Sequence, residues 1–153
     1  MPEIKIRAFL VSLVAMRLVK DTWQVLLLKR ATTLAGEWCQ IAGSIEEGET
    51  AWQAAVRELA EETGLRPVEL YSADINEQFY EADRDAMTVA PVFLAIVDPE
   101  EKVSLNFEHS DYRWVSFEAA IEMVAFGGQR RVLRWIEDEF VHRKPSHHLK
   151  IEI

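Results

Sequence analysis

The sequence GSIEEGETAWQAAVRELAEETGL, residues 43–65, contains the strongest pattern in the chain and predicts a loop followed by a helix. Thr50 can cap this helix, and Gln53 stands three residues later, as a capping box requires. Gly64 follows the last helical residue and suits the left-handed conformation that ends many helices. We therefore expect a helix over residues 50–63.

Three carboxylates share one side of the expected helix. Because helical residues advance by about 100° each, Glu58, Glu61 and Glu62 fall within one sector roughly 100° wide. Ala51 and Ala54 lie in the same sector, so no large side chain covers the carboxylates. The opposite sector is apolar and contains Trp52, Val56 and Leu59. A solvated helix surface is one explanation for such a run, and a site for a hard divalent cation such as Mg²⁺ is the other.

Outward from this helix, apolar segments alternate with polar breaks. The segments that read as strands are residues 4–18, 23–30, 37–42, 68–82, 86–98, 102–106 and 111–115. The segments that read as helices are residues 117–126 and 129–142, separated by Gly127-Gly128. The first two strands are expected to form a hairpin. This mixture predicts an α/β fold with a mixed sheet covered by helices on both sides. No repeat or linker interrupts the chain, so residues 1–153 are interpreted as a single domain.

The charge of the chain limits its partners. The formal net charge is -9, which argues against a long nucleic acid, because phosphate backbones are held by basic surfaces. A short phosphate ligand can still bind if a divalent cation bridges it to the protein. The single cysteine, Cys39, excludes an internal disulfide and fits a reducing compartment, so we expect a cytoplasmic protein.

Residues 8–16 are apolar and follow two basic residues, a pattern that is compatible with a signal peptide or with a buried strand. No small-residue cleavage site is clear, and Arg17 and Lys20 interrupt the run, which favours the strand. No stretch is long enough to span a bilayer, so no membrane partner is expected.

The spacing of residues 43–65 resembles a known family motif. Its order is Gly43, five residues, Glu49, seven residues, Arg57-Glu58-Leu59, one residue, Glu61-Glu62, one residue, and Gly64-Leu65. This is similar to the Nudix box at every defined position. The resemblance implies the Nudix α/β/α sandwich with a mixed β-sheet and a loop-helix-loop catalytic motif. It also implies hydrolysis of a pyrophosphate bond with Mg²⁺ as cofactor, for which Mn²⁺ can substitute.

The resemblance also assigns expected roles. In the family, the glutamates matching Glu58, Glu61 and Glu62 bind the catalytic metals, and the carbonyl before the box glycine, here that of Ala42, often joins them. Many members have Pro-Gly-Gly where this chain has Ile-Ala-Gly, so the local turn can differ. Structural roles are expected for Gly43, Glu49, Arg57 and Gly64: Arg57 and Glu49 would pair, and the two glycines would supply backbone conformation.

A further acid is expected from a loop outside the box. Glu108 lies six residues before Trp114, where similar proteins place such a glutamate. It would be a metal ligand or the base that activates water, and a plain surface charge is the alternative. The sequence leaves Glu58 and Glu108 open as the base, with Glu61 as a further catalytic candidate. Arg30 and Tyr80, at strand ends, are expected to contact substrate, whereas His109 is interpreted as a solvated loop residue.

The substrate class is less constrained than the reaction. The segment around Gln40, together with the missing Pro-Gly, resembles the bacterial dihydroneopterin triphosphate and deoxynucleoside triphosphate pyrophosphohydrolases. A nucleoside or pterin triphosphate would then yield a monophosphate and pyrophosphate. Residues 108–114 also resemble diadenosine polyphosphate hydrolases, and a nucleotide sugar is a third option. A Nudix module that senses a nucleotide without cleaving it is the alternative from another class. The sequence leaves the number of metals open, and monomer and homodimer are both compatible with it.

Overall fold

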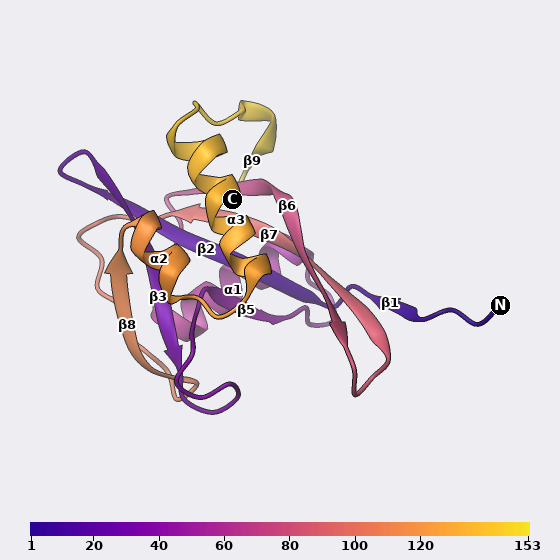
Figure 1. Ribbon diagram of the computed structural model, residues 1–153. Helices are drawn as coiled ribbons and strands as arrows, with labels where there is room; N and C mark the ends of the chain where they lie inside the picture. The colour runs from indigo at the N-terminus through magenta and orange to yellow at the C-terminus, as the bar shows by residue number, and fades with distance from the viewer.

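A mixed sheet forms the centre of the fold in the computed structural model, which describes residues 1–153 (Figure 1). The strands are β1 (Lys5–Arg7), β2 (Leu10–Val19), β3 (Thr22–Arg30), β4 (Trp38–Cys39), β5 (Ile41–Ser44), β6 (Glu69–Glu81), β7 (Ala86–Ile96), β8 (His109–Val115) and β9 (Lys150–Ile151). The helices are α1 (Ala51–Thr63), α2 (Phe117–Met123) and α3 (Gly127–Ile136), followed by a π-helical turn, η1 (Glu137–Val141), and a 3₁₀ turn, η2 (His147–Leu149).

The strand order is β4-β3-β2-β7-β6-β9, with β1 on β7, β5 on β2 and β8 on β3. The expected hairpin is confirmed, since β2 and β3 pair in antiparallel fashion, and β2 also pairs with β7 in parallel. Both faces of these central strands are covered, which explains why β2 and β3 read as continuous apolar runs.

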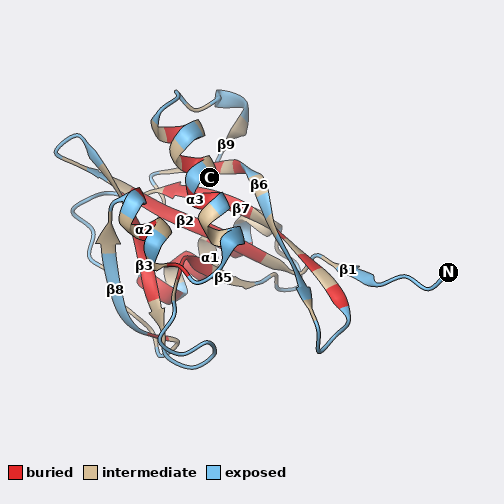
Figure 2. Ribbon diagram, viewed as in Figure 1, coloured by how far each residue is buried: buried red, intermediate tan, exposed pale blue.

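Each face of the sheet has its own hydrophobic core, because side chains alternate across a strand. Val14 and Met16 of β2 point to the core shared with α2 and α3. Leu13 and Ala15 point to the core that contains the apolar side of α1. Figures 1 and 2 show α2 and α3 in front of the sheet and α1 behind it, with the buried residues along the central strands. The expected α/β fold with helices on both faces is therefore confirmed.

The start and end of α1 follow the signals in its sequence. Thr50 and Gln53 form the reciprocal capping box, in which the Thr50 side chain accepts from the Gln53 amide and the Gln53 side chain accepts from the Thr50 amide at 2.8 Å. Gly64 adopts the left-handed conformation with φ 74°. The helix expected over residues 50–63 is confirmed, and its ends fix the direction in which its glutamates project.

Four segments differ from the expectation. The strand expected over residues 4–18 is two strands, β1 and β2, and the strand expected over residues 37–42 is also two, β4 and β5. The expected boundary Gly127-Gly128 is instead the beginning of α3. The strand expected over residues 102–106 is wrong. Its apolar residues, Val103 and Leu105, pack on the α1 side of the sheet, and the Ser104 amide donates to the Thr63 carbonyl at 2.8 Å. This segment therefore closes over the end of α1 rather than joining the sheet.

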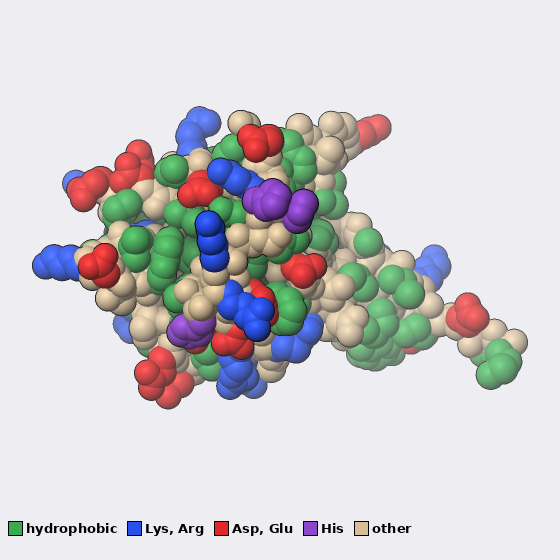
Figure 3. Space-filling model, turned by 90° about the horizontal axis from the view of Figure 1, so that it is seen from above, with side chains coloured by type: hydrophobic (Ala, Val, Ile, Leu, Met, Phe, Trp, Pro, Cys, Tyr) green, Lys and Arg blue, Asp and Glu red, His purple; other side chains and the backbone are tan.

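The surface carries mixed charge. On the face shown in Figure 3, acidic side chains lie among the basic ones. The N-terminal residues extend away from the body of the molecule, as Figures 1 and 3 both show. Neither α1 nor any other helix has the length and apolar character needed to cross a membrane.

Candidate active site

The three glutamates of α1 lie in different environments. Glu62 is almost fully buried, with a side-chain exposure of 2%, and Glu58 is nearly as buried at 11%. Glu61 is 52% exposed. The expected open carboxylate face is therefore only partly correct, because α1 turns Glu58 and Glu62 inward beside Leu59. Two buried acids in one helix are unusual unless a partner compensates their charge.

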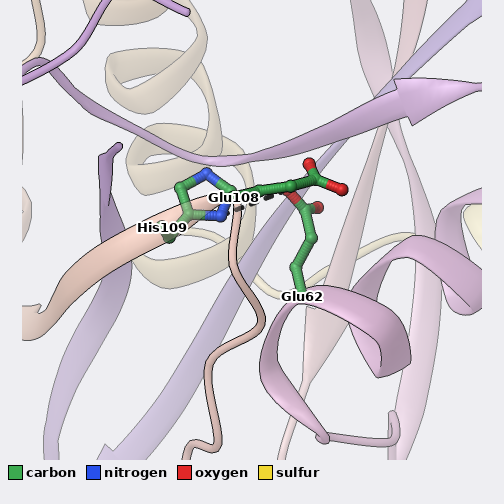
Figure 4. A group of neighbouring side chains, drawn as sticks. All are labelled: Glu62, Glu108 and His109. Atoms are coloured by element: carbon green, nitrogen blue, oxygen red, sulfur yellow. Dashed lines mark ion pairs between the residues drawn. The ribbon is translucent and has the colours of Figure 1, made fainter. Parts of the chain in front are cut away.

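Glu62 lies next to Glu108, which immediately precedes β8, and next to His109, the first residue of β8 (Figure 4). One ligand atom from each of the three lies within 4.8 Å of the others. Nδ1 of His109 is 3.6 Å from Oε1 of Glu62, and neither Nδ1 nor the Oε2 atom of Glu62 has a hydrogen-bond partner. The expectation of a solvated His109 is wrong: it is 6% exposed, because β8 pairs it with Arg30 of β3.

Burial and like charges set the protonation of this cluster. Burial, together with the nearby carboxylates of Glu58 and Glu108, raises the pKa of Glu62 to about 9. Burial likewise raises the pKa of Glu58, although the hydrogen bond that its carboxylate accepts from Arg57 opposes this rise. Burial, assisted by the charge of Arg30, lowers the pKa of His109. Without a cation the cluster therefore favours a protonated Glu62 beside a neutral imidazole.

Arg57 connects the loop before α1 to two of the glutamates. Its guanidinium donates to Glu49 at 2.7 Å and to the carbonyl of Ser44 at 2.8 Å. It also reaches Glu58 at 2.9 Å and Glu61 at 3.2 Å. The hydrogen bond from Arg57 lowers the pKa of Glu49 and keeps that carboxylate ionised. The pairing expected for Glu49 and Arg57 is present, and Arg57 also compensates the charge of the two nearby helix acids.

Gly43 allows β5 to approach α1. A Cβ atom at this position would collide with the carboxyl group of Glu58 and would lie 2.6 Å from its Cγ atom. The backbone at Gly43 does not have a positive φ, unlike that at Gly64. The expectation of a conformational role is therefore right for Gly64 and wrong for Gly43, where the missing side chain provides space for Glu58.

A pocket of about 660 Å³ adjoins the carboxylates. Its walls come mainly from β2, β5, β6 and the start of α3, and they include both Arg30 and Tyr80. Ala42 and Gly43 line the pocket as well. Gly43 lies against the Glu58 side chain, and the nearby backbone of Ala42 opposes the rise in the pKa of Glu62. These two residues of β5 are therefore the wall between the pocket and the acidic cluster.

A polar network inside the pocket was not anticipated from the sequence. Glu77 of β6 accepts hydrogen bonds from Ser12 of β2, at 2.9 Å, and from the amide of Gln40. Gln129 of α3 donates to Gln40 at 3.1 Å. The only sequence signal for this network is an acidic residue, Glu77, within an expected strand. A bulge between Ser72 and Asn76 interrupts the alternation of side chains, so the sequence does not show which face of the sheet Glu77 occupies.

Comparisons with known proteins agree with this architecture. The family model of the NUDIX domain matches residues 9–136. The chain is 37% identical over 113 residues to an octanoyltransferase of Myxococcus xanthus, a match that covers 72% of this chain and 31% of that protein. It is 32% identical over 110 residues to the asymmetrical bis(5'-nucleosyl)-tetraphosphatase of Caenorhabditis elegans, covering 71% of this chain and 79% of the relative. It is 29% identical over 136 residues to the dihydroneopterin triphosphate diphosphatase of Escherichia coli K12, covering 80% and 89%.

Solved structures give the same answer. A C. elegans Ap4A hydrolase, crystallised as a binary complex, superposes with a TM-score of 0.73 at 25% identity, covering 84% of this chain and 94% of that one. The family model covers most of the chain, including β2, the box helix α1 and α3. With its box glutamates placed beside a pocket, the chain belongs to the Nudix family of pyrophosphohydrolases.

Proposed function

We propose that this chain hydrolyses a pyrophosphate bond in a nucleoside or pterin triphosphate, depends on Mg²⁺, and releases a monophosphate and pyrophosphate. The observation that carries the proposal is the buried, unpartnered oxygen of Glu62, together with a ligand-sized pocket lined by Ala42 and Gly43 of β5, the strand that packs on α1. The E. coli relative named for dihydroneopterin triphosphate supports this substrate class, since the match covers 80% of the chain.

The acidic cluster fits a hard divalent cation. Glu58, Glu61, Glu62 and Glu108 offer oxygen ligands, and the carbonyl of Ala42 adds another, which is the donor set that Mg²⁺ or Mn²⁺ prefers. The raised pKa of Glu62 shows that its ionised form lacks a compensating charge in the protein alone. The neutral imidazole of His109, 3.6 Å from Glu62, is a less suitable ligand for Mg²⁺ and would instead orient the Glu62 carboxylate.

Each residue then has a distinct task. A bound cation supplies neutralisation of phosphate charge and a lower pKa for the attacking water. Glu58 and Glu108 are the two candidates that accept the proton of that water. Arg57 and Glu49 hold the loop against α1, so that Glu58 keeps its position. Arg30 offers a cationic group to the phosphates, and Tyr80 offers an aromatic surface to the ring of the substrate.

A dinucleoside polyphosphate is the second candidate substrate. The C. elegans relative is named as a bis(5'-nucleosyl)-tetraphosphatase, and a C. elegans Ap4A hydrolase superposes closely. The two candidates differ in their products. A nucleoside triphosphate would yield a monophosphate and pyrophosphate, whereas Ap4A cleaved asymmetrically would yield ATP and AMP.

The test is a substrate panel with Mg²⁺, in which ³¹P NMR identifies the phosphorus products. The panel contains deoxynucleoside triphosphates, dihydroneopterin triphosphate, Ap4A and ADP-ribose. Glu62→Gln should reduce turnover by orders of magnitude, and EDTA should abolish it. Glu122→Gln, an exposed acid on α2, is the matched control and should retain activity. Exclusive turnover of Ap4A or ADP-ribose would overturn the triphosphate assignment.

A further inference from the structure

The carboxylate of Glu77 is held by one oxygen and leaves the other free. Its Oε1 atom accepts from the Ser12 hydroxyl and from the Gln40 amide, and that amide also donates to Ser12 at 3.0 Å. Gln129 completes the network by donating to the Gln40 carbonyl oxygen. The Oε2 atom of Glu77 accepts no hydrogen bond from the protein, although Glu77 lines the pocket. Three neighbouring polar side chains therefore fix a carboxylate that retains one unused acceptor.

We propose that Glu77 determines the specificity of the pocket by accepting hydrogen bonds from a ring that carries an N–H group next to an amino group. Guanine and the pterins present this 2-amino-4-oxo edge. The inference rests on the proposed function, because it assumes that the pocket receives the ring of a triphosphate. Ser12 and Gln40 act as positioning residues, since both donate hydrogen bonds to the Oε1 atom of Glu77 and thereby fix its carboxylate.

The chemistry of other rings explains the preference. A carboxylate oxygen is an acceptor only, so the two lone pairs of the free Oε2 atom can accept from two adjacent donors but oppose a ring nitrogen lone pair. Adenine places its N1 lone pair beside its single amino group, and uracil and thymine flank one N–H with two carbonyl oxygens. Burial gives Glu77 a raised pKa overall, and the hydrogen bonds from Ser12 and Gln40 and the nearby charge of Arg131 limit this rise because they stabilise the ionised carboxylate.

The position of Glu77 in the pocket suits the ring end of a triphosphate. Phe79 and Tyr80 follow it on β6, and Phe126 lies at the start of α3; all three aromatic side chains line the pocket. Tyr80 and Phe126 are more than half exposed, and the Tyr80 hydroxyl donates to Asp85 at 2.8 Å. Ala42 and Gly43 line the same pocket beside the acidic cluster. A ring between aromatic faces would thus extend its phosphates toward the α1 glutamates.

The test measures binding without turnover. Dissociation constants of dGMP, dIMP and dAMP are determined by calorimetry in the absence of divalent cations, for the wild type, Glu77→Gln and Glu69→Gln. The nucleotide dIMP lacks only the 2-amino group, so the ratio of its Kd to that of dGMP isolates one contact. We expect the wild type to bind dGMP about 10- to 100-fold more tightly than dIMP or dAMP, the range for a charge-assisted hydrogen bond.

Glu77→Gln should bring the Kd values of dIMP and dGMP to within about threefold of each other, because an amide has one acceptor oxygen whereas a carboxylate has two. Glu69→Gln changes an acid at the other end of β6, outside the pocket, and should leave the ratio unchanged. A purely structural effect of Glu77→Gln would weaken all three nucleotides equally and leave the ratio intact, which would overturn the proposal. If this variant does not fold, Ser12→Ala removes one positioning contact and should lower the same ratio.

Turnover separates this inference from the proposed function. Wild-type protein that binds dGMP selectively but cleaves no triphosphate would refute the proposed function and support the role of Glu77. Wild-type protein that cleaves dGTP, dITP and dATP with equal kcat/KM, and binds the three monophosphates equally, would refute the role of Glu77 and leave the proposed function standing.

Discussion

Replacing Glu62 by glutamine should make the metal-free protein more stable while removing its activity. In the folded protein the pKa of Glu62 is raised from 4.5 to about 9, chiefly by burial. A folded state that holds a proton more tightly than the unfolded state loses stability as the pH rises between these two values. The effect is absent at pH values below about 4.5 and grows through the neutral range until the folded protein itself loses the proton near pH 9.

The size of this destabilisation follows from the interval between the ordinary pKa of Glu62 and the pH of the experiment. At pH 7.5 the carboxyl lies three pH units above its ordinary pKa, and each unit corresponds to roughly 1.4 kcal/mol, about 4 kcal/mol in all. Glutamine removes the titration but still buries a polar amide, so we expect a gain of about 2–4 kcal/mol. For a chain of this length that gain raises Tm by roughly 5–15 °C.

The assay is thermal unfolding in EDTA from pH 5 to 9, with and without subsequent addition of Mg²⁺. Wild-type Tm should fall as the pH rises, whereas the Tm of Glu62→Gln should change less. Mg²⁺ should stabilise the wild type more than the variant, because the variant has lost an anionic ligand. Equal pH dependence in the two proteins, or a lower Tm for Glu62→Gln at pH 7.5, would refute the reasoning from burial.

Three other substitutions test the remaining contacts. Arg57→Ala should destabilise the protein by about 2 kcal/mol or more and also lower kcat, since Glu49 and Glu58 lose a charged partner; unchanged Tm with reduced activity would indicate direct substrate contact. Glu108→Gln should lower kcat by on the order of 10²-fold with little change in KM if Glu108 is the base. Near-normal kcat, with a strong loss in Glu58→Gln at the same Mg²⁺ concentration, would assign the base to Glu58. Gly43→Ala should displace Glu58 and cost about 1–3 kcal/mol with a loss of activity, whereas Gly127→Ala, where a Cβ meets only ordinary contacts, should behave like the wild type.

The parts of the fold that were predictable depend on local chemistry. The capping box of Thr50 and Gln53 and the left-handed Gly64 are determined within a few residues, so α1 was predicted with its ends. The segment 102–106 has the alternation of a strand but pairs with none of the strands of the sheet, and pairing of this kind is decided by the whole fold. The strand β9, at the C-terminus, pairs with β6 from far along the chain and left no local signal.

In the candidate site, too, some features follow from the local sequence and others depend on the whole fold. The positions of Glu58, Glu61 and Glu62 on one side of α1 follow from helical spacing, and the structure confirms the helix. Their different burial does not follow from spacing, because it depends on how closely β5 and β8 approach α1. His109 illustrates the difference: its place next to an expected loop acid favours a solvated side chain, but pairing of β8 with β3 buries it against Glu62.

The two-residue wall formed by Ala42 and Gly43 has a consequence for how such a protein can diversify. On one side of the wall lie the acids of α1, and on the other lie side chains from β2, β6 and α3. Substitutions on β6 or α3 can therefore change the shape and polarity of the pocket without disturbing the acids of α1. Changes to the wall itself act on both sides at once, so these two small residues should be the least replaceable part of the boundary, although neither carries a reactive group.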